Sequence, residues 1–368
     1  MNKNSCFRAP HLLDWAIHLT ENFTMRFKSV AIQGIARILP PNSLTSSDID
    51  ARLAPALERL GLRPGMLESL AGIRSRRLWD PRTQPSQVAA QAAEAALRDA
   101  NIPLASIDLL INASVSRDFL EPATASIIAG TLGVAPTCTS FDLSNACLGF
   151  VNAMDVAATM IEAGRIDHAL IVAGETAEPL YDATLARLLR NDATTQDFKN
   201  NLASLTLGSA AVAMVLSRAS MFDTLPMYRG GVSRSANQFH GLCRGTYDSM
   251  HTDTKTLMVA GLDLALQTKI AFEENENFPM SDFDHLAVHQ VSSAHTEAVV
   301  KVLGQDRKKI HTIFETEGNI GPAGIPVVLE YLKSTGQMQG SRVGLLGIGS
   351  GLNCMMTYIE SPKKEAAP

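Results

Sequence analysis

The chain has 368 residues, of which 46% are hydrophobic and 19% charged, so it can bury a large core and exceeds the length of one ordinary domain. A net charge of -5 gives no general attraction to nucleic acid or to an anionic membrane surface, and we expect neither as a partner. No apolar run reaches the 18 residues that a transmembrane segment needs.

The five cysteines are irregularly spaced and include no Cys-x-x-Cys pair. This pattern predicts free thiols in a reducing compartment, and hence a cytoplasmic protein without a disulfide framework or a zinc site. A weak apolar stretch near the start, Leu12–Ile17, is interrupted by Asp14, and no small-residue cleavage site follows it. We therefore predict no signal peptide and treat residues 1–25 as an N-terminal extension.

Hydrophobic periodicity in the first half predicts strands that alternate with helices. In chain order, we expect a strand at Val30–Ile38, helices near Ser46–Leu60 and Ser86–Ala100, a strand at Ile107–Ser114, a helix from Pro122 to Leu132, a strand running into Cys147, a helix to Ala163, and a strand at Ala169–Gly174. This alternation favours a mostly parallel sheet covered by helices. The polar segment Arg187–Asn201 is expected to form a surface helix or a cap over the site.

The second half repeats this order. Phe283–Ser292 can be laid on Ile107–Ser116 at an offset of 284 − 108 = 176, and Arg342–Gly347 falls where the repeat predicts a strand. Phe314-Glu315 matches Phe141-Asp142 at an offset of 314 − 141 = 173, which predicts a further strand there. The sequence therefore predicts two similar halves.

The buried-strand pattern ends before Ala219–Pro226, which we take as the junction of the halves. We assign residues 26–220 to the first half, residues 221–362 to the second half, and residues 363–368 to a tail.

Cys147 is the strongest candidate for a catalytic residue. It lies where an apolar strand pattern changes into the helical pattern that starts at Leu148. Unpaired N–H groups and the positive end of the helix dipole would favour the thiolate, so we expect a pKa below the usual value of about 8.5. Alone, such a cysteine is more often a small buried hydrophobic residue than a nucleophile.

Three further features fall at comparable places. His289 ends an apolar strand, Asn319 lies in a glycine turn before a helix, and small residues close the last strand at Gly347–Leu352. Each has an ordinary structural explanation, but their coincidence at equivalent positions of a repeat favours a site. A thiolate, a base or donor, an amide donor and a backbone oxyanion site together suit acyl transfer.

Other motifs do not support a different chemistry. The glycines from Gly347 to Gly351 have the wrong spacing for a dinucleotide loop and lack the βαβ unit that should follow them. His285 and His289 share a strand face without a nearby cysteine or carboxylate at ligand spacing, so we predict no metal site. The chain has no Gly-x-Ser-x-Gly elbow and no phosphate-binding Gly-x-x-x-x-Gly-Lys loop, which disfavours a serine hydrolase and an NTPase.

Four segments carry a resemblance to the thiolase superfamily: Asn145–Phe150, His289–Ser292, Gly318–Ala323 and Gly349–Leu352. The branch that they resemble most is that of the β-ketoacyl-ACP synthases III. Within it, Gly72–Trp79, Ser116–Pro122 and Gly347–Cys354 look most like the OleA family, whose members condense long-chain acyl-CoAs in bacterial olefin synthesis. The resemblance covers roughly residues 26–360.

This resemblance implies an α/β fold of five layers, αβαβα, with two halves related by pseudo-two-fold symmetry, in an obligate homodimer. It implies that Cys147 accepts the acyl group, that His289 and Asn319 face the thioester oxygens, and that the backbone N–H groups of Cys147 and Ser350 form an oxyanion site. Glu121 would reach the active site of the partner subunit and act as the base. No cofactor is implied other than the coenzyme A of the substrate.

The implied reaction is a non-decarboxylative head-to-head Claisen condensation of two long-chain fatty acyl-CoAs, through an acyl-Cys147 intermediate, to a 2-alkyl-3-oxo fatty acid. Its downstream partners would be a reductase, a lactone-forming synthetase and a decarboxylase. We expect coenzyme A to be bound by residues at the mouth of the site and by the terminal glycines: Arg74, Arg76, Arg77, Trp79, Gly349 and Gly351.

Two departures bear on the reaction. Biosynthetic and degradative thiolases have a second catalytic cysteine where this chain has Gly347. Synthase III enzymes usually read His-Gln-Ala-Asn, whereas Val291-Ser292 stand here in the last two places. The alternative of a decarboxylative synthase III that uses acyl-CoA and malonyl-ACP stays open. So does an esterase or simple acyltransferase; a non-catalytic scaffold is disfavoured because the cysteine, histidine and asparagine are all present.

Overall fold

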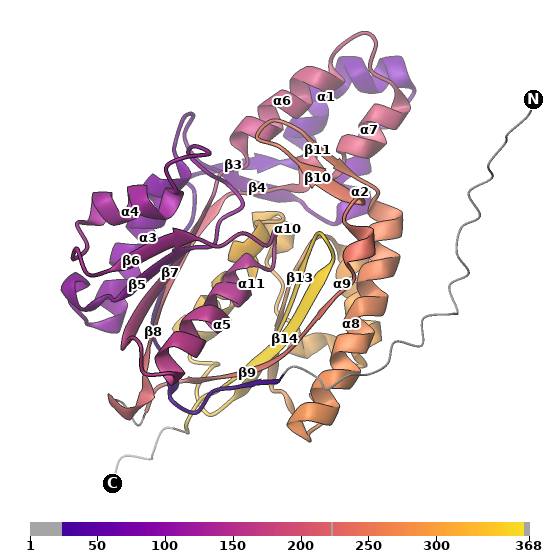
Figure 1. Ribbon diagram of the computed structural model, residues 1–368. Coiled ribbons are helices and arrows are strands. Elements are labelled where there is room, and N and C mark those ends of the chain that lie inside the picture. Colours follow the sequence, from indigo (N-terminus) through magenta and orange to yellow (C-terminus); the bar gives the residue numbers. More distant parts are fainter. Residues whose placement is uncertain (1–23, 222–223, 364–368) are drawn as a thin grey trace, which may run out of the picture.

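The computed structural model describes residues 24–221 and 224–363 (Figure 1). The first strand, β1 (Thr24–Arg26), pairs antiparallel with β9 (Met227–Ser235). The sequence analysis assigned Thr24 and Met25 to an extension, whereas the structure places them in a strand of a sheet. The rest of the expected extension, and residues 364–368 of the expected tail, lie outside the described residues.

One sheet is built entirely from the first half of the chain. Its strand order is β6-β5-β7-β8-β2, and the strands are β2 (Val30–Ile38), β5 (Leu109–Asn112), β6 (Thr139–Asp142), β7 (His168–Glu175) and β8 (Ala210–Arg218). The β5–β6 and β5–β7 pairs are parallel, whereas the β7–β8 and β2–β8 pairs are antiparallel. The expectation of a mostly parallel sheet is therefore wrong, because alternation in the sequence does not fix the direction of β8.

The second sheet has the order β12-β13-β14-β9, with β1 at the end next to β9. Its other strands are β12 (His285–Val288), β13 (Arg342–Gly349) and β14 (Asn353–Glu360). Only the β12–β13 pair is parallel. The two sheets are joined by the single pair of Ala31 with Met227.

Helices separate and cover the two sheets (Figure 1). Helices α5 (Gly149–Glu162) and α11 (Gly324–Ser334) pack between the sheets in one apolar core. Helices α3 (Pro85–Ala100) and α4 (Thr124–Leu132) cover the outer face of the first sheet, while α8 (Thr254–Glu276) and α9 (Ser293–Leu303) cover that of the second. The result is the predicted αβαβα arrangement.

Burial explains why α5 occupies the central layer. Its apolar residues Phe150, Met154, Ala157 and Ile161 recur at helical spacing and are fully buried. Burying one phenylalanine or methionine side chain stabilises a fold by about 1.5–3 kcal/mol. The helix that follows the candidate nucleophile is therefore held firmly between the sheets.

The repeat fails at one expected strand. Residues Phe314–Glu317 form the short helix α10, and β12 has instead a single bridge between Leu286 and Ile310 on this side. The side chain of Gln290 supplies the missing hydrogen bonds: its Oε1 accepts from the N–H groups of Ile313 at 2.8 Å and Phe314 at 3.2 Å, and its Nε2 donates to a neighbouring carbonyl. The Gln290 side chain thus makes hydrogen bonds to the segment in which the repeat predicted an edge strand.

A smaller helical region lies at one end of the molecule, at the top of Figure 1. A separate apolar core there joins α1 (Ser46–Leu60), α2 (Met66–Ala71), α6 (Glu178–Leu188) and α7 (Thr195–Asn201). Two two-stranded sheets, β3–β4 (Asn42–Thr45, Ser75–Leu78) and β10–β11 (Cys243–Gly245, Met250–Thr252), lie beside it. The polar segment that was expected as a surface helix or cap contains the end of α6 and all of α7.

No helix within the two described ranges is both long and apolar enough to span a bilayer.

Candidate active site

Cys147 lies in a sharp turn that leads into α5. Strand β6 ends at Asp142, so four residues separate it from the cysteine, and the expectation of a strand running directly into Cys147 is wrong. Ala146 has a φ of 47°, a left-handed conformation that a residue with a side chain rarely adopts. The N–H of Leu148 donates to the carbonyl of Asn145, and the N–H of Gly149 to that of Ala146, both at 3.1 Å. These bonds close the turn around the cysteine.

Three asparagine amides hold this turn in place. Asn145 donates from Nδ2 to Oδ1 of Asn152 on α5 at 2.7 Å and accepts from Nδ2 of Asn353 on β14 at 3.1 Å. The turn is therefore tied both to its own helix and to the second sheet. Our sequence interpretation missed Asn152 and Asn353, because only the folded chain brings β14 against the turn.

The glycines that end β13 let this strand lie against the cysteine turn. A Cβ atom on Gly349 would lie 2.6 Å from the carbonyl oxygen of Asn145, and one on Gly347 would lie 2.4 Å from a methyl group of Leu148. Ser350, the next residue after β13, therefore lies close to the cysteine turn. In the described part of the chain, the backbone N–H groups of Cys147 and Ser350 donate to no other residue.

Replacing Gly349 with alanine should disturb this contact. We expect the free energy of unfolding to fall by about 1–3 kcal/mol, because the added methyl group overlaps a backbone oxygen that cannot move freely. Gly130 on α4 is the matched control, since a Cβ there meets nothing within 4 Å and alanine favours a helix by about 1 kcal/mol. Urea unfolding of both variants measures the difference, and equal stabilities would contradict the packing argument.

The charge state of Cys147 differs from the sequence prediction. The thiol is half-buried but so closely surrounded by protein that its pKa rises to about 12, with the nearby carboxylate of Glu175 as the second cause. The lowered pKa expected from the helix N-terminus is therefore wrong for the free protein. The cysteine precedes the first residue of α5 by two positions, and only its own backbone N–H favours the thiolate.

Alkylation of Cys147 by iodoacetamide should consequently be slow at neutral pH. With a pKa of about 12, the thiolate fraction at pH 7 is about 10⁻⁵, against about 3 × 10⁻² for an ordinary thiol. We expect the rate to rise about tenfold per pH unit from pH 7 to pH 10, as followed by mass spectrometry of the Cys147 peptide. A plateau below pH 8 would instead indicate the lowered pKa.

His289 directly follows β12, and its N–H continues the ladder by donating to the carbonyl of Leu346 at 2.9 Å. The residue is only 8% exposed, and burial lowers the pKa of its imidazole to about 3, helped by the neighbouring His295. The imidazole is thus neutral at pH 7, with one N–H to donate and one nitrogen to accept.

His295 was not predicted from the sequence. It lies in the first turn of α9, with its ring centre 6.2 Å from that of His289. Burial lowers its pKa to about 4, and its Nδ1 has no hydrogen-bond partner among the described residues. A second histidine six positions after the first was the available signal.

Asn319 lies in the turn between α10 and the 3₁₀ turn Gly321–Ala323. Its backbone bonds to Thr206 and Gly208, each at 2.9 Å, and its Oδ1 accepts from the N–H of Gly321 at 3.0 Å. The amide nitrogen makes no hydrogen bond with the described residues, so its N–H groups can donate to a ligand.

Contacts between these segments gather them at one edge of the two sheets. His289 bonds to Leu346, and Gly347, the next residue of β13, packs on Leu148 beside the cysteine. On the other side, the carboxyl carbon of Glu175 lies 4.0 Å from the Cβ position of Gly321, in the turn that contains Asn319. The structure thus brings Cys147, His289, Asn319 and Ser350 to neighbouring places. Glu175, at the end of β7, was missed by the sequence analysis because its role depends on contacts across the sheet.

The structure does not bring Glu121 to this place within its own chain. Glu121 is exposed, in the loop between β5 and α4, and makes no hydrogen bond or ion pair with the described residues. Phe119 and Leu120 beside it are 58% and 81% exposed.

The expected binding rim for coenzyme A is wrong in two places. Arg76 is completely buried, where its guanidinium donates to Leu44 and Ser46 and has its pKa lowered to about 10 by burial. Trp79 is also buried, and its indole N–H donates to the carbonyl of Glu175 at 3.0 Å.

The rest of that rim is accessible to different degrees. Arg74 is exposed, and Arg77 is half-buried in an ion pair with Glu317 at 3.3 Å. Sequence reasoning could not separate the four residues, since β4 alternates between a buried face and an exposed face only once it is paired with β3.

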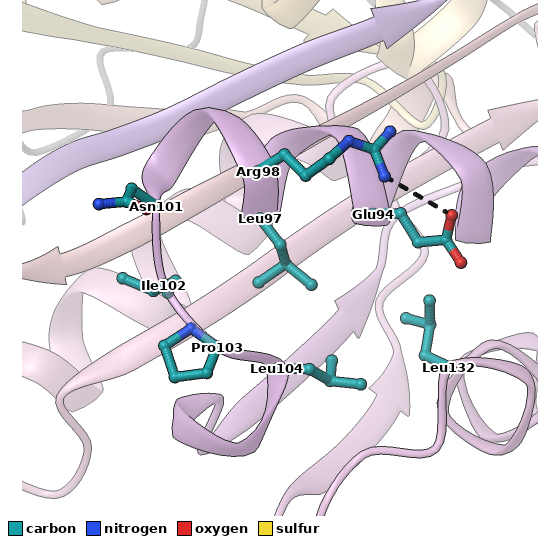
Figure 2. A pocket seen from close by; sticks show the side chains of 8 residues that line it. All are labelled: Glu94, Leu97, Arg98, Asn101, Ile102, Pro103, Leu104 and Leu132. Carbon is teal, nitrogen blue, oxygen red and sulfur yellow. Dashed lines mark ion pairs between the residues drawn. The ribbon is translucent and has the colours of Figure 1, made fainter.

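A surface hollow elsewhere does not belong to this site. The groove in Figure 2, of about 570 Å³, lies between the end of α3 and Leu132 and includes the ion pair of Glu94 with Arg98 at 3.9 Å. None of the candidate residues lines it. Across the described ranges, no group of three or more histidine, cysteine or acidic side chains is arranged to hold a metal ion.

Comparison with known proteins agrees with this arrangement. Residues 141–225 match the family of 3-oxoacyl-[acyl-carrier-protein] synthase III, and residues 274–361 match its C-terminal family. A β-ketoacyl-[acyl-carrier-protein] synthase III of Desulfitobacterium hafniense is 28% identical over 91% of this chain and 99% of its own.

Enzymes named acyl-CoA:acyl-CoA alkyltransferase are more similar. That of Xanthomonas campestris is 50% identical over 91% of this chain and 99% of its own, and that of Shewanella oneidensis is 34% identical over 91% and 100%. The crystal structure of cerulenin-bound OleA from Xanthomonas campestris superposes with a TM-score of 0.90, at 50% identity, over 91% of this chain and 98% of that chain. The chain therefore belongs to the OleA family of acyl-CoA:acyl-CoA alkyltransferases, in the synthase III branch of the thiolase superfamily.

Proposed function

We propose that this protein condenses two long-chain fatty acyl-CoAs head to head, without decarboxylation, and releases a 2-alkyl-3-oxo fatty acid. The observation that carries the proposal is the contact of the Cys147 turn with the end of β13, where the N–H groups of Cys147 and Ser350 donate to no other described residue. The 50% identity to an acyl-CoA:acyl-CoA alkyltransferase selects the substrates.

The first step transfers an acyl group to the enzyme. The sulfur of Cys147 forms a bond to the thioester carbon, the bond to the coenzyme A sulfur breaks, and the thiol proton passes to the departing coenzyme A. Because the resting thiol and the His289 imidazole are both neutral, charge develops only in the transition state. Each donor of an oxyanion site contributes about 2.7–4 kcal/mol at that point.

The second step forms the carbon–carbon bond. A base removes the α-proton of the second acyl-CoA, the enolate carbon attacks the acyl-Cys147 carbonyl, and the cysteine leaves as a thiolate that regains a proton. Neutral His289 and the amide nitrogen of Asn319 donate to the enolate oxygen. Hydrolysis of the remaining thioester with one water then gives coenzyme A and the free acid. No step changes an oxidation state, so the proposal requires no cofactor.

Glu121 of a second subunit is the proposed base. Its exposure, and that of Phe119 and Leu120 beside it, suit a loop that enters a neighbouring molecule. Strand β6 lies at the open edge of its sheet, where an identical strand could pair to form a homodimer.

Three residues of the Xanthomonas campestris OleA that were substituted in solved structures have the same spacing as the candidates here. Solved structures of that enzyme include substitutions of a glutamate, a cysteine and a histidine. The glutamate lies 26 residues before the cysteine, and the histidine lies 142 residues after it. Here 147 − 121 = 26 and 289 − 147 = 142, so Glu121, Cys147 and His289 have the same spacing. Another of those structures, a cysteine-to-serine variant with a TM-score of 0.89, contains lauric acid and lauroyl-CoA.

Arg74 and Arg77 are the remaining candidates for the coenzyme A phosphates, and Gly349 and Gly351 for contact with the substrate backbone. The acidic, β-keto product would be consumed by a reductase, and then by the synthetase and decarboxylase of an olefin pathway. The free thiols of the described residues agree with a cytoplasmic location.

The test is incubation with myristoyl-CoA alone, with free thiol release and lipid products measured by spectrophotometry and mass spectrometry. We expect a β-keto acid, or the ketone formed from it, built from two acyl chains. Free fatty acid alone, with condensation only after malonyl-ACP is added, would instead assign the protein to the decarboxylative synthase III class, whose family profiles it matches.

A further inference from the structure

Glu175 ends β7 and holds the beginning of the loop that carries Glu121. Its carboxyl group is buried, with the whole residue 6% exposed. One oxygen accepts from the N–H of Val115 at 2.8 Å, and the other accepts from the N–H and the hydroxyl of Ser116 at 3.2 Å and 2.8 Å. Three donors from two consecutive residues therefore converge on one side chain.

The far end of the same loop is held by a different acid. Asp142 accepts from the N–H groups of Thr124 at 3.0 Å and Ala125 at 2.8 Å, and its carboxylate lies 3.7 Å from the guanidinium of Arg117. Between these two anchors, Phe119, Leu120 and Glu121 are exposed. The base of the loop is thus fixed on both sides, while its tip projects from the subunit.

Glu175 also lies beside the active site of its own subunit. Its carboxyl carbon is 4.0 Å from the Cβ position of Gly321, next to Asn319, and its charge contributes to the raised pKa of Cys147. The carboxyl group therefore has two neighbours on which it can act: Cys147 of its own subunit and the loop that carries Glu121. The hydrogen bonds distinguish them, because all three donors to this carboxyl group among the described residues belong to the loop.

We propose that Glu175 is a positioning residue that acts through Val115 and Ser116 on the loop of Glu121, and so serves the active site of the partner subunit. This inference rests on the proposed function, in which Glu121 crosses to that site. Burial raises the pKa of Glu175 to about 7, while the hydrogen bonds from Val115 and Ser116 favour its ionised form, which suits this place because it only accepts hydrogen bonds. A glutamine of the same shape would turn an NH₂ group toward at least one of the three donors, and a displacement of about 1 Å at a reacting group can lower a rate about 100-fold.

Mixed dimers separate the two roles. One subunit carries Cys147→Ala and keeps Glu121, while the other carries Glu121→Ala and keeps Cys147. Different affinity tags on the two subunits allow the heterodimer to be isolated. Only one complete site then remains, and it combines the cysteine of the second subunit with the glutamate of the first.

Glu175→Gln is then added to one subunit at a time, and condensation of myristoyl-CoA is measured together with the initial burst of coenzyme A. We expect condensation to fall about tenfold or more when the substitution is in the first subunit, and less than twofold when it is in the second. The burst, which reports acylation of Cys147, should be unchanged in both. Ser116→Ala should give the same asymmetry if Glu175→Gln does not fold.

Glu178→Gln is the matched control. Glu178 is an acid on α6 that accepts from Trp79 and Ser209 and bonds to no residue of the Glu121 loop, so its substitution should have the same effect in either subunit. The reverse asymmetry, or equal effects of Glu175→Gln in both subunits, would overturn this inference alone. A parent heterodimer that makes no condensed product would overturn the proposed crossing of Glu121, and this inference with it.

Discussion

The Cys147→Ala variant is expected to release no coenzyme A from myristoyl-CoA and to form no condensed product, with turnover lower by a factor on the order of 10⁴ or more. Without the sulfur there is no acyl-enzyme, and the oxyanion donors have no tetrahedral intermediate to stabilise. The fold should persist, because the hydrogen bonds that close the turn are made by the backbone of Asn145, Ala146, Leu148 and Gly149. Thermal unfolding and product analysis on the same preparation check both statements.

Cys138→Ala is the matched control for this experiment. Cys138 is also a half-buried free thiol, and its pKa is also raised, chiefly by burial, but it lies in the segment between α4 and β6. Its loss should leave turnover within about twofold of the original. Residual condensation by the Cys147 variant, or a comparable loss in the Cys138 variant, would contradict the assignment of the nucleophile.

The second large effect is expected from Glu121→Ala. Acylation should continue, giving a burst of one coenzyme A per Cys147, whereas condensation should fall by about 10²- to 10⁴-fold, the usual contribution of a general base. This separation arises because only the second step requires removal of an α-proton. Rapid-mixing measurements of thiol release, combined with quantification of the condensed product, resolve the two steps.

Since Glu121 is exposed and has no partner among the described residues, its substitution should leave the free energy of unfolding unchanged. Glu94→Ala on α3 is the control, because this acid is also exposed but its ion pair is with Arg98 of the same helix. Loss of the burst in the Glu121 variant would assign the residue to acylation, and unchanged condensation would remove it from the mechanism.

Local patterns were sufficient for much of the secondary structure. The predicted strand at Val30–Ile38 and helix at Ser46–Leu60 are confirmed with the same bounds, because a buried apolar run and an amphipathic pattern with a Thr45 capping box are properties of neighbouring residues. The strand that was extrapolated to Phe314 is wrong, since the side chain of Gln290 occupies the hydrogen-bonding groups that the strand would have used.

The site shows the same division. The order of residue types along the chain was enough to name Cys147, His289, Asn319 and Ser350, because the four lie in short motifs that match one family. The pKa of Cys147, the burial of Arg76 and Trp79, and the anchoring role of Glu175 required the tertiary structure. Desolvation and hydrogen bonding depend on which distant segments surround a group, as Ser116 and Glu175 show from 59 positions apart. Periodicity and composition describe only neighbours along the chain, so they locate reactive groups but do not reveal the environment that sets their charge and orientation.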